Sequence, residues 1–64
     1  MDYTFIAMRV KNGKVEYLAD TIYRRRTRVR LWTTNSKKIK HLTIEEVYGI
    51  LEVVKDAIIQ RIDL

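Results

Sequence analysis

The segment Arg9-Val10-Lys11-Asn12-Gly13-Lys14-Val15-Glu16-Tyr17 holds the strongest local signal in the first half of the chain. Asn12 and Gly13 both tolerate a positive φ, which the two-residue loop of a type I′ β-hairpin requires. Such a loop sets the cross-strand pairs Lys11–Lys14, Val10–Val15, Arg9–Glu16, Met8–Tyr17, Ala7–Leu18 and Ile6–Ala19. The sequence therefore predicts two antiparallel strands, at about residues 2–10 and 14–23.

This register sorts the side chains of the hairpin onto two faces. One face is apolar and is expected to be the core side; it carries Ile6, Met8, Val10, Val15, Tyr17 and Ala19. The other face carries Tyr3, Phe5, Ala7, the Arg9–Glu16 pair, Leu18 and Asp20. A slip of one residue would mix the two sets, so the pattern supports this register.

Residues 27–33 alternate between apolar and polar side chains, which predicts a half-buried strand at about 26–34. Val29 and Leu31 point to one side, whereas Arg28, Arg30 and Trp32 point to the other. The run 24–26, three arginines, is interpreted as the turn or bulge before this strand. After a turn at 35–36, residues 37–42 are expected to form a short fourth strand at the edge of the sheet.

Thr43 begins a well-marked helix. Thr43-Ile44-Glu45-Glu46 has the form of a capping box, and the pair Leu42 and Val47 fits a hydrophobic staple. The apolar spacing extends this helix to about residue 62. The predicted fold is α+β, a single domain of residues 1–64 in which a four-stranded antiparallel sheet is followed by one long C-terminal helix (β-β-β-β-α).

The apolar face of the expected helix is wider than one packing surface needs. One side is expected to cover the sheet, and the other to meet the same helix of a second subunit. This homodimer interface is assigned to Ile50, Val53, Val54, Ala57 and Ile58. The alternative is a monomer with a few exposed aliphatic side chains.

The 64 residues contain 13 basic and 8 acidic side chains, and the charge is unevenly distributed. Residues 9–40 hold eleven of the basic groups and only two acidic ones. A cationic surface of this density attracts polyanions, although a solvated charged surface without a ligand is the alternative. The candidate nucleic-acid-binding residues are Arg9, Arg24, Arg25, Arg26, Arg28, Arg30, Trp32, Lys37, Lys38 and Lys40.

Several classes of chemistry lack the residues they need. The chain has no cysteine and one histidine, which excludes disulfides, zinc knuckles and iron–sulfur ligation. The single serine, Ser36, and the single histidine, His41, have no nearby acid to complete a catalytic triad. We expect neither an enzyme nor a cofactor or metal site. No apolar run approaches a membrane span and no signal peptide is visible, so a cytoplasmic protein without membrane contact is expected.

Single-stranded nucleic acid is bound by cations that follow the phosphates and by aromatic rings on which bases stack. Arg28, Arg30 and Trp32 combine both on one strand face, and the lysines at 37, 38 and 40 extend the charge. This favours a single-stranded nucleic-acid-binding module. The alternative role of Trp32 is packing at a sheet edge or dimer contact.

The segment Val29-Arg30-Leu31-Trp32, with residues 37–46 after it, resembles the Positive Cofactor Four family of transcriptional coactivators and its small bacterial and phage relatives. The resemblance spans residues 28–46. It implies a curved four-stranded sheet backed by one long helix, dimerisation through the helices, and single-stranded DNA binding.

Carried over by position, the resemblance gives Arg30 and Trp32 the roles of phosphate contact and base stacking. Lys37 and Lys40 match the basic turn and fourth strand of the family. Three positions depart from its pattern: Ile39 and His41 stand where relatives tend to have glycine, and Arg28 where an acid is common. The fold is therefore expected to be shared more securely than the ligand.

A second hypothesis fits the same small, cationic, non-catalytic chain. It is a phage-type inhibitor or interaction protein that acts in the host cytoplasm on a nucleic-acid-binding host protein, for example as an anti-CRISPR. A protein that coats duplex DNA is a weaker alternative, because the predicted helix is acidic on its polar face and unlike a recognition helix.

Overall fold

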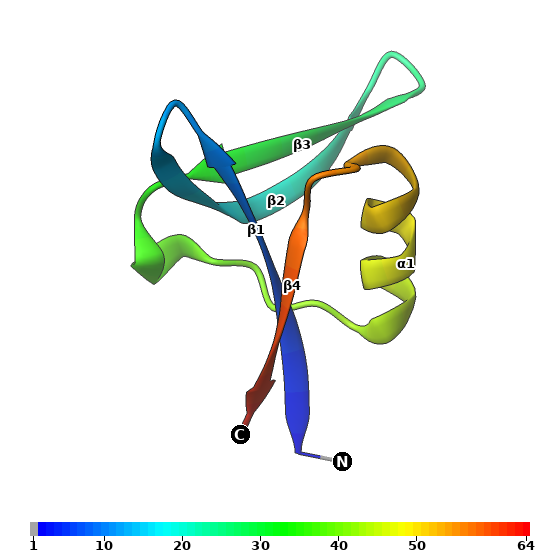
Figure 1. Cartoon of the computed structure of the whole chain (residues 1–64). Coiled ribbons are helices and arrows are strands. Elements are labelled where there is room, and N and C mark those ends of the chain that lie inside the picture. The colour runs from blue at the N-terminus through cyan, green and yellow to red at the C-terminus, as the bar shows by residue number, and fades with distance from the viewer. Residues whose placement is uncertain (1) are drawn as a thin grey trace.

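The computed structural model describes residues 2–64. Their elements, in chain order, are β1 (Tyr3–Lys11), β2 (Lys14–Arg24), β3 (Thr27–Thr33), a 3-10 helix (Ser36–Lys38), α1 (Ile44–Val53) and β4 (Ile58–Asp63). The strands form one antiparallel sheet in the order β3-β2-β1-β4. The helix α1 stands at one side of this twisted sheet (Figure 1). The core lies between them and consists of Ala7, Leu18, Leu42, Val47 and Ile50.

The class α+β is correct, but the predicted order of elements is wrong. The helix is short and lies inside the chain, and β4 follows it as the last element. β4 pairs along β1, with Met8 opposite Ile58 and Tyr3 opposite Asp63. The order implied by the resemblance to the coactivator family, with the helix last, is therefore not the order of this chain.

The predicted helix 44–62 ends at Val53 because its C-terminal third forms a strand instead. The Val54 N–H donates to the Ile50 carbonyl at 2.8 Å, and a turn at 55–56 redirects the chain. Residues 58–63 include three isoleucines, and β-branched side chains suit a pleated strand better than a helix. The apolar face of the predicted helix was unusually wide because the segment contains two elements, a helix and a strand, whose apolar side chains repeat with different periods.

The predicted helix-to-helix dimer surface is not formed. Ile50 is buried in the core, Val54 and Ala57 pack against it, and Ile58 lies in β4. Among the five assigned residues, only Val53 is exposed on α1.

The β1–β2 hairpin has the predicted register. Met8 pairs with Tyr17, Arg9 with Glu16, Val10 with Val15, and Lys11 with Lys14. Asn12 and Gly13 form the loop with φ values of 53° and 74°. The predicted turn between β2 and β3 also forms, with Arg24 opposite Thr27.

The pairing of β1 with β2 ends at Met8 and Tyr17, and the next part of the chain fills the gap beyond. The Lys40 N–H donates to the Leu18 carbonyl at 2.9 Å, and Leu42 forms a two-bond bridge with Phe5. Residues 37–42 are therefore not the predicted edge strand. Their first part is a 3-10 helix, whose N-cap Asn35 accepts the Lys37 N–H.

The helix covers the sheet face opposite to the one predicted. Ala7 and Leu18 are fully buried beneath it, with Phe5, Trp32 and Ile59 packed around them. Both faces carry apolar side chains, so alternation alone does not identify the covered one. The bridge between Leu42 and Phe5 decides it, because it fixes where the chain enters α1.

The N-terminus of α1 forms as predicted. The Thr43 hydroxyl accepts the Glu46 N–H at 3.3 Å, and the Glu46 carboxylate accepts the Thr43 N–H at 3.1 Å. Leu42 and Val47, the proposed staple, are both buried in the core. This cap holds α1 beside the β2–β3 hairpin. Among residues 2–64, no helix is long and apolar enough to cross a membrane.

Candidate nucleic-acid interface

The strand face that carries Arg28, Arg30 and Trp32 is not an open platform. It is the face toward α1, since Trp32 packs against the core beside Leu18. The indole is half-buried, and the guanidinium carbon of Arg9 lies 4.4 Å from its ring centroid. Trp32 is therefore more covered than the sequence interpretation expected, and its role in base stacking stays a prediction.

Arg9 has two internal partners. Besides the indole, its Nε donates to the Glu16 carboxylate at 2.8 Å. Arg9 is therefore engaged inside the molecule through its Nε and its contact with the indole. Its role in nucleic-acid binding stays a prediction.

The arginines that have no carboxylate partner lie on the β2–β3 hairpin. We call the segment Tyr23–Arg28 the arginine hairpin; its arginines are Arg24, Arg25, Arg26 and Arg28, all exposed. In the part of the chain that the structure describes, none of them lies within 4 Å of a carboxylate, whereas Arg9 and Arg61 each do. Cations without carboxylate partners are free to meet an external polyanion.

The loop of the arginine hairpin is held in an unusual backbone conformation. Arg25 and Arg26 have φ values of 51° and 65°, close to those of the Asn12-Gly13 loop. Residues other than Gly, Asn and Asp rarely adopt this left-handed region, and each costs about 1–2 kcal/mol there. Arginine at both loop positions therefore makes this turn less stable than Asn-Gly would.

Tyr23 supplies an exposed aromatic ring at the base of this hairpin. Its side chain is 72% exposed, and the guanidinium carbon of Arg28 lies 5.5 Å from its ring centroid. The sequence interpretation missed Tyr23. The available signal was its position directly before the arginine run, and the Leu18/Asp20 bulge in β2 turns it to the helix side.

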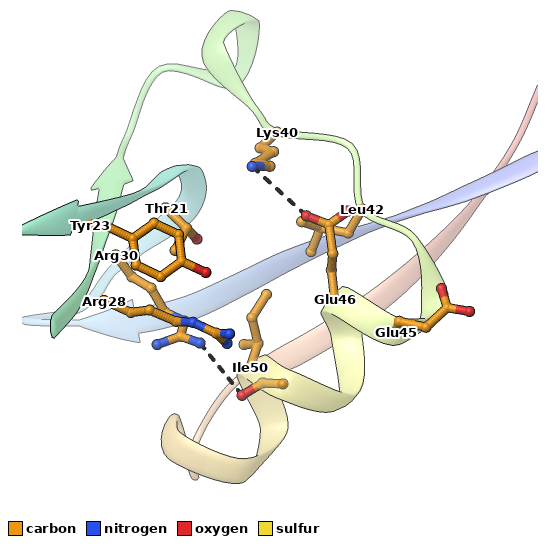
Figure 2. A pocket seen from close by; sticks show the side chains of 10 residues that line it. Thr21, Tyr23, Arg28, Arg30, Lys40, Leu42, Glu45, Glu46 and Ile50 are labelled. Atoms are coloured by element: carbon orange, nitrogen blue, oxygen red, sulfur yellow. Dashed lines mark hydrogen bonds and ion pairs between the residues drawn. The ribbon is translucent and has the colours of Figure 1, made fainter. Parts of the chain in front are cut away.

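Arg28 and Arg30 lie side by side and reach toward α1 (Figure 2), where both approach Gly49. An Nη2 of Arg30 donates to the Gly49 carbonyl at 3.5 Å, and the Nη1 of Arg28 lies 3.9 Å from where a Cβ on Gly49 would stand. Arg30 is half-buried, and its Nε is buried without a hydrogen-bond partner. Two guanidinium groups thus reach the same turn of α1, and one of them has a donor without a partner.

A cleft of about 340 Å³ opens between the β2–β3 hairpin and α1. Its walls are formed by Thr21, Tyr23, Arg28, Arg30, Lys40, Leu42, Glu45, Glu46, Gly49 and Ile50. Lys40 lies on the far wall, where its Nζ is 3.7 Å from Asp20 and 3.8 Å from Glu46. The two arginines therefore make one wall cationic, while the lysine opposite is neutralised by carboxylates.

The predicted basic residues thus divide into groups. Arg24, Arg25, Arg26, Arg28 and Arg30 are brought together with Lys40 around the cleft and the hairpin. Lys37 and Lys38 are exposed on the 3-10 helix, which lies at the other side of the molecule from the arginine loop (Figure 1). Within residues 2–64, no group of three His, Asp or Glu side chains is placed to hold a metal ion.

Comparisons with protein-family models, with curated proteins and with solved structures found no match to this chain. The site alone therefore indicates the function of this chain.

Proposed function

We propose that this protein binds single-stranded nucleic acid through the arginine hairpin and the adjoining cleft. The observation that carries the proposal is the concentration of arginines without carboxylate partners on one hairpin, in a chain that pairs Arg9 and Arg61 with carboxylates. A strand that neutralises these cations releases counterions, which gives salt-dependent affinity without sequence readout.

The cleft offers a place for one phosphodiester group. A phosphate oxygen beside Gly49 would meet the Nη groups of Arg28 and Arg30 together. Guanidinium groups bind phosphate oxygens through parallel N–H donors, which fixes both position and orientation. An anion here would also relieve the repulsion between the two arginines.

Tyr23 provides a more exposed stacking surface than Trp32. Its exposed ring lies between the loop arginines and the cleft, so a base next to a bound phosphate could stack on it. Stacking of one base contributes about 1–3 kcal/mol. An exposed ring favours unpaired bases, because bases in a duplex already stack on one another. A cytoplasmic location, in a host if a phage encodes the chain, would give access to such ligands.

The test measures binding of a fluorescein-labelled oligothymidylate to the purified protein by anisotropy at several salt concentrations. The variant Arg25→Asn/Arg26→Gly removes two charges and keeps the loop geometry. Two phosphate contacts contribute about 25-fold to affinity at 0.1 M salt. We expect a loss of about this size and a shallower dependence of log Kd on log salt.

The matched control is Lys11→Gln/Lys14→Gln, which removes two charges at the other hairpin tip. It has the same net charge as the arginine variant but should lose much less affinity. Tyr23→Ala and Tyr48→Ala form a second pair, since Tyr48 is also exposed but lies on α1 away from the loop. If the two variants of each pair lost the same affinity for the oligonucleotide, binding would not depend on the positions of the proposed site, and the proposed site would be wrong.

Duplex DNA, duplex RNA and single-stranded RNA of matched length are measured beside the labelled strand. Tighter binding of a duplex than of its single strands would overturn the single-strand preference. Absence of binding to all four at 50 mM salt would overturn the proposed function itself.

A further inference from the structure

Among residues 2–64, α1 does not cover the opposite face of the sheet, where Ile6 is buried but the side chains toward the Asn12-Gly13 loop and on the edge strands are exposed. Cross-strand partners point to the same side of a sheet, and successive residues alternate. Ala7, Leu18 and Ile59 lie under the helix, so Met8, Tyr17 and Ile58 point away from it. Thr33, Tyr17, Met8 and Ile58 are successive partners and form one row across all four strands.

This open face is apolar. Its large apolar side chains, taken from the same pairings, are Ile6, Met8, Val10, Val15, Tyr17, Ile22, Val29, Leu31, Ile58 and Ile62, of which Ile6 is buried. Val10, Val15, Leu31 and Ile58 are 42–55% exposed. The nearest carboxylate, on Asp20 at the bulge opposite Leu31, lies 3.7 Å from Lys40. A surface of this extent and composition marks an interaction site.

The accessible surface of the whole chain supports the same conclusion. It is 5053 Å² for a mass of 7.7 kDa. A folded monomer of this mass exposes about 4,300 Å² by the usual scaling of area with mass, so the excess is about 700 Å². One partner in an interface of standard size buries about 800 Å². The excess over the whole surface is therefore close to the area that one stable contact needs.

We propose that a second copy of this chain docks on the open face, forming a face-to-face dimer through the two sheets. The chain carries a net charge of +5, so two copies repel each other over most of their surfaces. The open face is the exception, because its apolar side chains carry no charge. A two-fold axis through this face places like surfaces together, as closed dimers do. The arginine hairpins of the two copies then lie on the outer sides of the dimer.

The dimer is tested by sedimentation velocity over a range of protein concentrations in 1 M salt. High salt screens the repulsion and excludes association through adventitious nucleic acid. We expect twice the 7.7 kDa chain mass at micromolar concentration. Val15→Asp places a charge in each half of the interface and should weaken the dimer by about 100-fold or more, since a buried unpaired charge is strongly unfavourable.

Val53→Asp is the matched control, because it introduces the same charge at another exposed valine, which lies on α1. It should leave the dimer intact. If Val15→Asp fails to fold by circular dichroism, the conservative pair Val10→Thr/Val15→Thr is used, and a measurable rise in the dimer Kd is expected.

Three results would overturn the proposal. The first is that the wild-type protein stays monomeric at 100 µM. The second is that Val53→Asp breaks the dimer and the Val15 variants do not. The third is that the protein is a monomer that sediments with anionic lipid vesicles through this face. Because the readout is mass in the absence of nucleic acid, failure here is distinct from failure of the proposed function.

Discussion

The two β-hairpins of this protein have the same loop geometry and opposite loop chemistry. Each has two residues between paired positions, Lys11 with Lys14 and Arg24 with Thr27, and in each both loop residues have a positive φ. The first loop is Asn12-Gly13, the pair that this conformation favours most. The second is Arg25-Arg26, which the conformation disfavours.

The difference shows what each loop is suited to. The Asn12-Gly13 loop is explained fully by the turn that it makes. The Arg25-Arg26 loop is strained, and backbone strain of this kind persists where the surrounding structure enforces it and concentrates at functional sites. Here the Leu18/Asp20 bulge and the pairing of β2 with β3 enforce the turn, and the strain holds two guanidinium groups at an exposed tip.

Exchanging the loop chemistry should have the largest effect. Asn12→Arg/Gly13→Arg puts two arginines into the first loop between two lysines. We expect the free energy of unfolding to fall by about 2–3 kcal/mol, from backbone strain and from repulsion between like charges. Urea denaturation measures this loss. An unchanged midpoint would show that this loop geometry accepts arginine without cost, and the contrast between the loops would disappear.

The reverse exchange should stabilise the protein. Arg25→Asn/Arg26→Gly removes the strain from the second loop, and we expect a gain of about 1–2 kcal/mol in the free energy of unfolding. The same variant is expected to lose affinity for nucleic acid, so stability and binding should move in opposite directions. A variant that loses both would show that the arginines make a structural contribution that their lack of carboxylate partners does not reveal.

The sequence predicted those parts of the fold that local chemistry determines. The β1–β2 register, the β3 alternation and the capping box at Thr43 all depend on residues close together in the chain. The covered face, the end of α1 and β4 depend on distant contacts. The bridge between Leu42 and Phe5 and the pairing of β4 with β1 have no local signature.

The same distinction between local and distant contacts applies to the candidate site. The run Arg24–Arg26 was identifiable from charge alone, and its position in a turn from the strands on either side. Trp32 is more covered than expected because its exposure depends on which face the helix covers. The convergence of Arg28 and Arg30 on Gly49 joins two elements about twenty residues apart, and the sequence interpretation gave Gly49 no role.

A single substitution isolates the backbone requirement of the first loop. At Gly13 φ is 74°, and nothing lies within 4 Å of a Cβ placed there. Gly13→Ala should therefore cost about 1–1.5 kcal/mol through conformation alone, without a steric clash. Thermal unfolding measures the change, with Lys14→Ala as a neighbouring control outside the loop. A neutral result would indicate that the loop relaxes to another turn type.

Substitution of Gly49 should have the smallest effect, and it tests the part of α1 that faces the β2–β3 hairpin. Its φ is ordinary for a helix, and a Cβ there would meet only the Nη1 of Arg28, at the van der Waals distance of 3.9 Å. Gly49→Ala should raise the free energy of unfolding by about 0.5–1 kcal/mol, because glycine is less favourable than alanine inside a helix.

Affinity for nucleic acid should stay unchanged in Gly49→Ala, since the methyl group leaves the carbonyl and both guanidinium groups in place. Gly49→Leu is the informative partner, because its longer side chain would occupy the space between Arg28 and Arg30. We expect it to weaken binding without a matching loss of stability. If Gly49→Leu bound as tightly as the parent, no phosphate would lie beside Gly49, and the interface would be confined to the exposed loop and Tyr23.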